Sequence, residues 1–461
     1  MQGAPLQPSV WEGLKIVHPN AAGLDISSIE VWAAVSPERN REPLRRFGTY
    51  TPDLHELADW LQACGVDSIA MEATGVDWIP VYEVLEARGF EVYVVNARHI
   101  KNVPGRKSDI QDCQWIQGLH SVGLLRGSFR PAAEIATLRA YLRHRAGLIE
   151  HRAAHILHMQ KALGQMNVQV TQAVKDITGV TGLAIIRAIV AGERNPHKLA
   201  ALRQPGVKKT EQEIAKALTG NYRPEHLFAL KQALALYDAY TGQLRECDAE
   251  IEWQFANLKP TVPLDDLPPL DSSDKPETNS KNGPNYDART LLYQWAGVDL
   301  VAIRGLNAST VQIILSETGI DLSAWPSEKH FCSWLGLAPH NDISGGKVLR
   351  SRTLKTHNRA GQAFRMAAQS VSRSPNSAFG VFYRRMRARL GSRQAIVATA
   401  HKIARTFYYM LKHRTPFHDM GGQEYERRAR ERELHNLQRR AAKLGLALIA
   451  APVASTADAV S

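Results

Sequence analysis

Short apolar runs alternate with amphipathic segments over the first quarter of the chain, and this alternation limits the fold more than any other feature. The apolar runs are rich in Ile and Val or almost wholly apolar, as strands are, whereas the segments between them have the apolar spacing of helices. The expected strands are residues 23–35, 68–72 and 90–96, and the expected helices are 78–88 and 109–122. Strands alternating with helices predict an α/β domain with a largely parallel sheet.

Four acidic residues in this domain are placed where they could share a metal site. Glu72 ends the second strand, at the edge where open α/β sheets bind ligands. Asp25 is expected early in its strand, so that it reaches the site from another direction. Asp109 and Asp112 lie three residues apart and therefore on one helix face. Four carboxylates without Cys or His partners favour Mg²⁺, and two such ions can clamp the attacking and leaving oxygens of a phosphodiester.

Each acid also has a simpler interpretation. An Asp at the junction of a strand and a loop is usually a turn former. An acid in the first turn of a helix offsets the helix dipole, and Asp109 or Asp112 could do only that. Glu72 is the strongest candidate, because Glu is rarely buried without a partner.

The net charge indicates the kind of partner, and the cysteines indicate the cellular compartment. The formal net charge of the 461 residues is +12, which favours a polyanionic partner such as nucleic acid; the alternative is a basic protein without one. The four cysteines lie far apart and form no CxxC pair, so we expect free thiols in a reducing bacterial cytoplasm, near the nucleoid, and no zinc. No apolar run is long enough to span a membrane, and no secretory signal pattern is present.

Composition divides the chain into blocks. The α/β domain is followed by a helical block rich in His, Arg and Ala, in which a long helical pair or coiled coil for dimerisation is plausible. Its arginines 139, 143, 145 and 152 suggest either a solvated face or a nucleic-acid contact. A stretch rich in Pro, Asp and Ser then predicts a linker. The expected blocks are 20–128, 131–258, 260–286, 287–415 and a charged, then disordered, tail at 421–461.

Two signals in the fourth block suggest contacts with phosphates. Residues 301–319 predict a helix, a glycine-containing hairpin at Gly305 and Asn307, and a second helix from about Ala308 whose backbone amides could bind a phosphate. The alternative is a hairpin that only packs the domain. Further on, Ser344 precedes two glycines in a predicted flexible loop. The candidate phosphate-binding residues in and after this loop are Gly345, Gly346, Lys347, Arg350, Arg352, Lys355, Arg384 and Arg385.

Ser344 is a candidate nucleophile only if a base, a metal or a cationic pocket activates its hydroxyl. A Gly-rich turn whose serine caps a turn explains the spacing equally well. The arginines at 384–389 are either a DNA-facing surface or a solvated helix face.

The order of these pieces resembles the bridge-RNA-guided insertion-sequence transposases of the IS110 family. The similarity spans about residues 20 to 415, and single motifs in it are weak whereas their order is specific. The matching motifs are Gly-Leu-Asp25-Ile-Ser, Met-Glu72-Ala-Thr-Gly, Lys-Ser-Asp109-Ile-Gln-Asp112, Gly-Val-Asp-Leu-Val-Ala-Ile-Arg-Gly-Leu at 297–306, Ser-Trp-Leu-Gly-Leu-Ala-Pro at 333–339 and Ser344-Gly-Gly-Lys.

The resemblance implies a RuvC-like (RNase H-like) α/β domain with a DEDD acidic set, a helical insert, and a mainly α transposase domain with a helix-hairpin-helix-like element. It implies that Asp25, Glu72, Asp109 and Asp112 bind Mg²⁺ and that Ser344 forms a covalent serine–DNA intermediate. It also implies donor and target DNA, a structured bridge RNA, and dimers that assemble into a tetramer. Two alternatives remain: a Mg²⁺-dependent nuclease or junction resolvase that uses water, and a non-catalytic nucleic-acid-binding protein.

Overall fold

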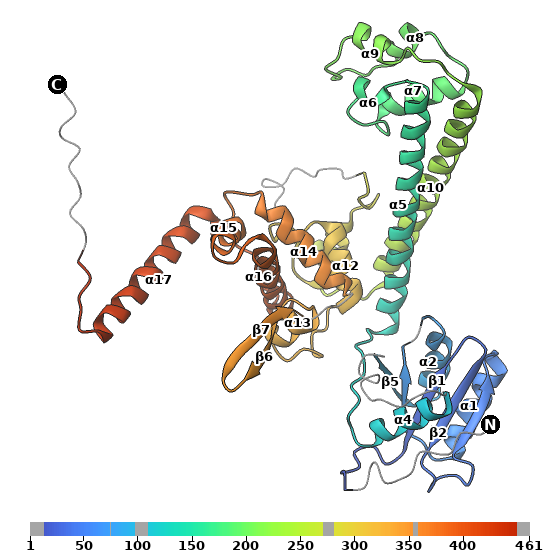
Figure 1. Cartoon of the computed structure of the whole chain (residues 1–461), viewed down its shortest axis with the longest axis vertical. Coiled ribbons are helices and arrows are strands. Elements are labelled where there is room, and N and C mark those ends of the chain that lie inside the picture. Colours follow the sequence, from blue (N-terminus) through green and yellow to red (C-terminus); the bar gives the residue numbers. More distant parts are fainter. Residues whose placement is uncertain (1–12, 74, 97–108, 271–280, 354–357, 450–461) are drawn as a thin grey trace. The chain divides into compact units, whose positions relative to one another are not determined.

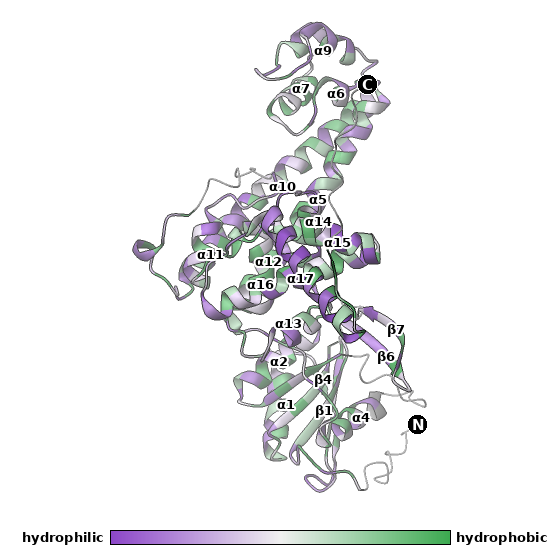
Figure 2. Ribbon diagram, turned by 90° about the vertical axis from the view of Figure 1, so that its left-hand side faces the viewer, coloured by the Kyte–Doolittle hydropathy of each residue, from purple (hydrophilic) through white to green (hydrophobic). Residues whose placement is uncertain are grey.

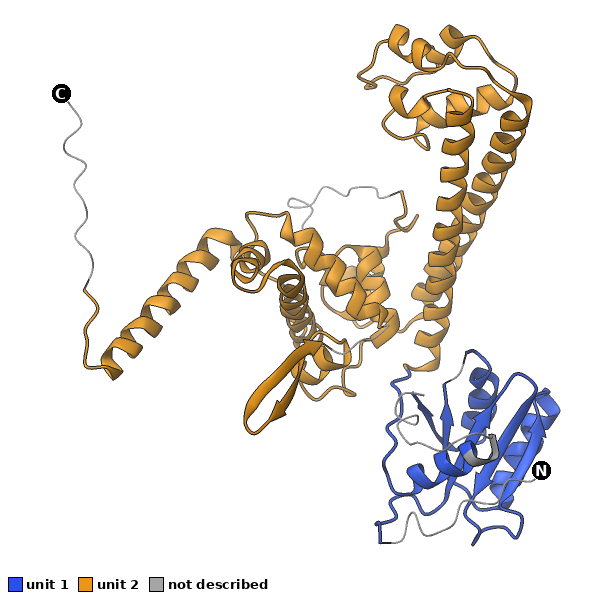
Figure 3. Ribbon diagram, in the orientation of Figure 1, with its two compact units in different colours: residues 1–130 blue, residues 131–461 orange. Residues whose placement is uncertain are grey.

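The computed structural model describes residues 13–73, 75–96, 109–270, 281–353 and 358–449, with residues 109–111 described by their backbone alone. The chain divides into two compact units, residues 1–130 and 131–461, which are coloured separately in Figure 3. Among the described residues, no helix combines the length and apolar character needed to cross a bilayer.

Unit 1 is built on a five-stranded mixed sheet in the order β3-β2-β1-β4-β5. Strands β1, β4 and β5 are parallel, whereas β1, β2 and β3 are antiparallel neighbours. The expected mixture of strands and helices is therefore confirmed, but the prediction of a largely parallel sheet is wrong for one half of it. The strands are β1 Ala21–Ile26, β2 Glu30–Val35, β3 Leu44–Gly48, β4 Ser68–Glu72 and β5 Glu91–Val95.

The predicted single strand over residues 23–35 is wrong, because the chain reverses at Ser27. The Ser27 hydroxyl accepts hydrogen bonds from the amides of Ile29 and Glu30 and donates one to the Glu30 carbonyl, at 3.0–3.4 Å. These bonds replace the strand ladder with a tight turn. Asp25 consequently lies at the carboxyl end of a short strand, not at the start of a long one.

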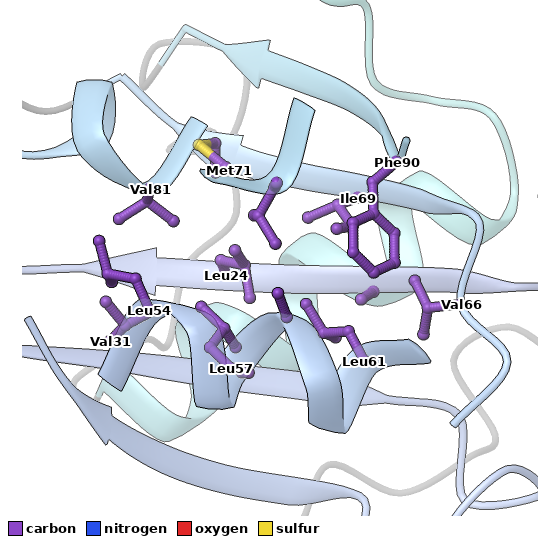
Figure 4. Packing of buried hydrophobic residues seen from close by; sticks show 14 of the residues in the cluster. Leu24, Val31, Leu54, Leu57, Leu61, Val66, Ile69, Met71, Val81 and Phe90 are labelled. Atoms are coloured by element: carbon purple, nitrogen blue, oxygen red, sulfur yellow. The ribbon is translucent and has the colours of Figure 1, made fainter. Parts of the chain in front are cut away.

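Helices cover both faces of the sheet (Figure 1). Helices α1 (Thr51–Ala63) and α2 (Trp78–Ala87) pack on one face, where Leu24, Ile69 and Met71 join their side chains in an apolar core. Figure 4 shows this core between α1 and the strands. Helix α4 (Asp109–Ser121) covers the other face, and its Ile116 packs against Ala70 and Val95.

Unit 2 begins with two long helices, α5 (Ala133–Gln165) and α10 (Pro224–Asn257), which lie side by side in Figure 1. Four short helices pack at the far end of this pair around a separate apolar core that includes Ile185 and Ile214. They are α6 Val170–Ala173, α7 Val180–Val190, α8 Pro196–Ala200 and α9 Glu211–Ala217.

Several arginines of α5 contact other parts of unit 2, an arrangement that neither of the two interpretations of these arginines included. Arg143 forms hydrogen-bonded ion pairs with the carboxylate of Glu317, at 2.8–3.1 Å. Arg145 contacts the buried Asp248 at 2.5 Å and donates hydrogen bonds to the carbonyls of Asn282 and Gly283. Part of the predicted linker is therefore fastened to the helical pair; residues 271–280 lie outside the described residues.

The remainder of unit 2 is mainly helical around an aromatic core. Phe331, Phe364, Phe407 and Tyr408 are almost completely buried, and the Tyr408 hydroxyl donates a 2.8 Å hydrogen bond to the Trp325 carbonyl. A two-stranded hairpin, β6 (Pro339–Ser344) and β7 (Lys347–Thr353), extends from this part. The helical elements are η2 Leu264–Asp266, α11 Ala288–Ala296, η3 Leu300–Ala302, α12 Ala308–Thr318, α13 Glu328–Trp334, α14 Arg359–Ser372, α15 Ala378–Leu390, α16 Ser392–His413 and α17 Gly421–Lys443.

Candidate active site

Two of the four candidate acids lie next to each other at one edge of the sheet. In the parallel pairing of β1 with β4, Leu24 is the partner of Met71, and the next residues are Asp25 and Glu72. Leu24 and Met71 both enter the core on the α1 side. Because side chains alternate along a strand, Asp25 and Glu72 share the opposite face, at the carboxyl edge. Both are half-buried.

The facing helix, α4, runs against the direction of β1 and β4. Near its C-terminus, the ring of His120 contacts the hydroxyl of Ser68, at the start of β4, with 2.6 Å between Nε2 and Oγ. One turn earlier, the Gln117 amide donates to the carbonyl of Ala21, at the start of β1. The N-terminal turns of α4, which carry Asp109 and Asp112, therefore lie toward the carboxyl edge of these strands.

A close backbone approach fixes α4 at this distance from the sheet. A Cβ atom on Gly23 would collide with the carbonyl oxygen of Cys113 and the amide nitrogen of Gln117. Only glycine permits this contact. In the motif Gly-Leu-Asp, Gly23 allows the close packing of α4, and Asp25 follows two positions later. This packing role of Gly23 was not predicted from the sequence.

Two of the acids act on the same buried thiol, that of Cys113. Burial raises the pKa of the Cys113 thiol to about 12, and the negative charges of Asp25 and Asp112 contribute to this rise, whereas backbone hydrogen bonds oppose it. Asp25 and Asp112 come from different elements, yet both act on this one thiol. Cys113 is consequently a neutral thiol at physiological pH.

Glu30 is a further acid near this edge that sequence reasoning missed. It begins β2, directly after the turn that follows β1. Its carboxylate accepts a hydrogen bond from the Trp32 indole at 3.1 Å and pairs with Arg46 at 3.3 Å. These two partners compete with any metal for Glu30. A turn recognised at Ser27 would have placed Glu30 at the edge of the sheet that holds Asp25.

The donor chemistry suits a hard cation, although the described residues form no preformed cage. Asp25, Glu72 and Asp112 offer only carboxylate oxygens, the ligands that Mg²⁺ prefers. Within the part of the chain that the structure describes, no three His, Cys, Asp or Glu residues are grouped closely enough to hold a metal ion. The side chain of Asp109 lies outside the described residues. Mg²⁺ usually binds through one or two carboxylates with several waters, so such a cage is not required.

Ser344 occupies the tip of a β-hairpin, where a flexible loop was expected. It ends β6 and pairs with Lys347 across a turn formed by Gly345 and Gly346, whose φ angles are +55° and +75°. Two successive positive φ angles are typical of the tight turns that connect antiparallel strands. The two glycines are therefore required by the turn itself.

The hairpin tip is open to solvent. The neighbouring pair Ile343 and Val348 is 63% and 55% exposed. Among the described residues, no side chain is hydrogen-bonded to the Ser344 hydroxyl. Arg350 pairs with Asp342 at 3.1 Å, but three fifths of its side chain stays exposed, so a phosphate contact by Arg350 stays a prediction. Lys347 and Arg352 are exposed, and Lys355 lies outside the described residues.

The second helix of the predicted helix-hairpin-helix-like element has the expected start, because α12 begins at Ala308, whereas the expected first helix is only the 3₁₀ turn η3 (Leu300–Ala302). Asn307 is its N-cap, and the Asn307 side chain accepts hydrogen bonds from the amide and the hydroxyl of Thr310, at 2.8 and 2.7 Å. Gly305 has a φ of +94° and packs against the backbone of Ala367 in α14, which explains the glycine by packing. A phosphate contact by Gly305 or Asn307 stays a prediction.

Two predicted nucleic-acid ligands on α15 contact α17 instead of lying free. Arg385 pairs with Glu433 at 3.2 Å, and Arg384 lies 3.9 Å from Glu426. Arg384 also donates a 3.0 Å hydrogen bond to the Pro375 carbonyl. Both side chains keep about two fifths of their surface exposed, so these ion pairs do not preclude a further ligand.

Two family comparisons identify the chain. The DEDD transposase family of IS110 elements matches residues 22–168, and the transposase family IS116/IS110/IS902 matches residues 299–384. Together they cover about half of the chain, in the order expected from the motifs. The chain belongs to the IS110 family of transposases. A search of curated proteins found no match.

The two matched regions of this IS110-family transposase contain the two sets of candidate residues. All four acids lie within residues 22–168, and the hairpin with Ser344 lies within residues 299–384. Transposases act on DNA, which agrees with the basic charge of the chain. Helix α17 lies beyond both matched regions.

Proposed function

We propose that this IS110-family transposase cuts and rejoins donor and target DNA through a covalent bond between Ser344 and DNA, with a structured bridge RNA choosing the sites. The observation that carries the proposal is the position of Asp25 and Glu72 on one face, at the carboxyl edge of adjacent parallel strands. The facing helix adds Asp112. This arrangement, on a sheet that is antiparallel on one side of β1 and parallel on the other, supports an RNase H-like (RuvC-like) nuclease domain.

Asp25, Glu72, Asp109 and Asp112 would hold Mg²⁺. The cation, when bound, would polarise the scissile phosphate and lower the pKa of the attacking hydroxyl. The carboxylates themselves would position the cation. Without a cation, their negative charges would repel the DNA backbone. Asp25 and Glu72 are held by the strand pairing of Leu24 with Met71, and Asp112 by the close packing of α4 on Gly23. Rigid positioning of this kind is what phosphoryl transfer requires.

Ser344 would carry the covalent step. Its Oγ atom attacks phosphorus in line, a serine–phosphate bond forms, and the bond to the 3′ oxygen breaks and leaves a free 3′-OH. One proton leaves Ser344 and one is taken up by the departing oxygen. A 3′-OH from the other duplex then attacks the serine–phosphate bond and restores the hydroxyl, so no phosphodiester is lost to water. The exposed Lys347 pairs with Ser344 across the hairpin tip, where it can hold the phosphate, whereas Arg352 pairs with His340 near the other end of the hairpin.

RNA guidance, the dimer and the tetramer belong to the same proposal. Base pairing would read sequence while the protein reads shape and backbone, as in other RNA-guided systems. The net charge of +12 supports a large polyanionic partner. The expected division of the chain into a nuclease domain, a dimerisation block and a serine domain stays part of the proposal.

The test is an adduct assay on the full chain with Mg²⁺, the noncoding RNA that flanks the element, and labelled donor DNA. We expect a protease-sensitive protein–DNA adduct that is absent in Ser344→Ala. The matched control is Ser351→Ala, which alters a serine of β7 in the same hairpin and should keep the adduct. Equal adduct from Ser344→Ala and the unaltered chain would disprove the serine step. Omitting the RNA tests guidance separately, since unguided donor cleavage at the same site would contradict it.

A water-using nuclease is the second candidate, and the exposure of Ser344 favours it. A solvated hydroxyl without an adjacent base is a weak nucleophile. This candidate predicts free cleaved ends without an adduct and full cleavage by Ser344→Ala. The same gel separates the two candidates, because the adduct runs above the free DNA and collapses on proteolysis.

A further inference from the structure

Helix α17 and the end of α15 form a basic groove, most of which lies beyond the matched regions of the family. The groove has a volume of about 640 Å³. Five arginines and one glutamate supply its charged lining: Arg385, Arg389, Arg432, Arg439, Arg440 and Glu433. Figure 2 colours α17 mainly as hydrophilic. Like charges gathered on two adjacent helices repel each other, so the groove is suited to an anionic ligand.

Most of this positive charge is left uncompensated. Glu433 pairs with Arg385 at 3.2 Å. Within the described ranges, Arg389, Arg439 and Arg440 form no ion pair, and Arg432 lies 5.9 Å from the ring of Tyr425 without an acidic partner. Elsewhere on the same helix, Arg427 and Arg428 both pair with Glu424. The helix therefore has a neutralised N-terminal segment followed by a cationic segment.

The groove is held in shape by packing at the start of α17. The Gly422 amide donates a 2.7 Å hydrogen bond to the Asn376 carbonyl, and Ala429 is buried. The Lys402 ammonium of α16 lies 4.5 Å from the ring centre of Phe382 on α15 and 4.1 Å from that of Tyr425 on α17. This shared cation–π contact ties three helices together. The N-terminal half of α17 is thus fixed against α15 and α16, and the arginines lie along the helix from there.

We propose that the groove between α15 and α17 binds the phosphate backbone of duplex DNA. Arg432 and Arg439 are two helical turns apart on one face, a span of about 10 Å that corresponds to roughly three phosphates along one strand. Guanidinium groups bind phosphate oxygens without reading sequence. Single-stranded nucleic acid is less suited, because the two aromatic rings of the groove already carry Lys402 and are not free to stack on bases.

The groove would therefore act as a sequence-independent clamp on DNA that flanks the reacting site. The choice of DNA rests on the proposed function as a transposase, but it does not depend on the serine step. If the serine step is wrong, the adduct assay reveals it while DNA binding by the groove is unaffected. The two proposals can therefore be disproved independently.

The test uses the full chain with the triple substitution Arg432→Gln, Arg439→Gln and Arg440→Gln. Fluorescence anisotropy would measure binding of a labelled duplex of unrelated sequence over a series of salt concentrations. We expect affinity to fall roughly tenfold or more at low salt, and the slope of log K against log salt to decrease by roughly 2 to 3. The control Arg427→Gln, Arg428→Gln and Arg430→Gln removes the same charge from the same helix outside the groove.

Circular dichroism would establish that α17 remains helical in both triples. If both triple variants lost the same duplex affinity, the effect would come from net charge alone, and the proposed site would be wrong. Unchanged duplex binding by the groove triple would also overturn it. Loss of binding to a structured RNA hairpin, with duplex binding unchanged, would reject DNA and assign the groove to RNA.

Discussion

Leu24 pairs with Met71 across the parallel strands β1 and β4, and the residue after each of them is acidic. The same register that buries Leu24 and Met71 on the α1 side delivers Asp25 and Glu72 to the α4 side. A one-residue slip would exchange these faces. The apolar core therefore determines which residues can serve as acids at this edge.

Glu72→Gln should abolish DNA strand cleavage while leaving fold and DNA binding intact. The amide keeps the size of the side chain but removes the charge that attracts a cation, so we expect cleavage to fall at least about a hundredfold. A single-turnover cleavage assay measures this. Glu91→Gln, at the start of β5 on the opposite edge of the sheet, should cleave normally. Full activity in Glu72→Gln would remove this acid from the site.

Gly23→Ala should destabilise unit 1, because its methyl group collides with the backbone of α4 and not with a side chain that can move. Overpacking of this kind costs about 1–3 kcal/mol of unfolding free energy. Urea unfolding followed by tryptophan fluorescence provides the measurement. Gly147→Ala in α5 is the comparison: nothing lies near the added methyl, and an alanine should stabilise the helix slightly. An unchanged Gly23→Ala chain would contradict the close packing.

Asp248→Ala should destabilise unit 2 by about 3–5 kcal/mol, since it leaves the buried Arg145 guanidinium without its carboxylate. The segment around Asn282 and Gly283, which Arg145 also holds, should become a site of rapid proteolysis. Thermal unfolding and limited proteolysis would detect these effects.

The control for that experiment is Asp238→Ala, which breaks the exposed pair of Arg187 with Asp238. Such exposed pairs contribute at most about 1 kcal/mol, so little change is expected. Equal stability of the two variants would show that burial does not strengthen the Arg145–Asp248 contact.

Unit 1 should lose stability as the pH falls from 7 to 5, because of His120. Burial lowers the pKa of His120 from 6.5 to about 4, and the nearby His18 contributes. As the pH falls, His120 is therefore protonated in the unfolded chain before it is protonated in the folded one. The contribution of His120 to the free energy of unfolding is complete above pH 6.5 and is lost as the pH falls toward 4. Linkage gives a loss of about 2 kcal/mol between pH 7 and pH 5.

Urea unfolding of the His120→Gln chain at the two pH values would measure this contribution by difference. The glutamine cannot titrate, so its chain should lose about 2 kcal/mol less than the unaltered one. His55→Gln, at an exposed position of α1, should leave the difference unchanged. An identical pH response in all three chains would exclude His120 as its source.

Local patterns predicted the elements that local forces determine. The strand 68–72 is confirmed residue for residue as β4, and α2 and α4 lie within a residue of their expected ends. The turn at Ser27 was missed because it is made by a serine hydroxyl and contains neither Gly nor Pro, the usual signals of a turn. The partners of the α5 arginines could not be inferred, because Arg145 and Asp248 are separated by 103 residues and meet only when α5 packs on α10.

The acids were predicted from motif order, and the structure adds why two of them are neighbours. Asp25 was expected to approach the site from another direction, which is wrong because the strand ends one residue after it. The hairpin that bears Ser344 was expected as a loop, since Gly-Gly signals a turn but does not reveal the strand pairing on either side of it.

The exposed tip of the β6–β7 hairpin has a consequence for chemical probing of the protein. A solvated serine hydroxyl has the reactivity of an ordinary alcohol, unlike the activated serine of a hydrolase. Fluorophosphonate reagents, which report activated serines, should therefore leave Ser344 unlabelled in the free protein. Labelling that appears only when DNA and Mg²⁺ are present would mean that the substrate itself completes the reactive centre. In that case the Ser344 hydroxyl would become reactive only after DNA and Mg²⁺ have bound.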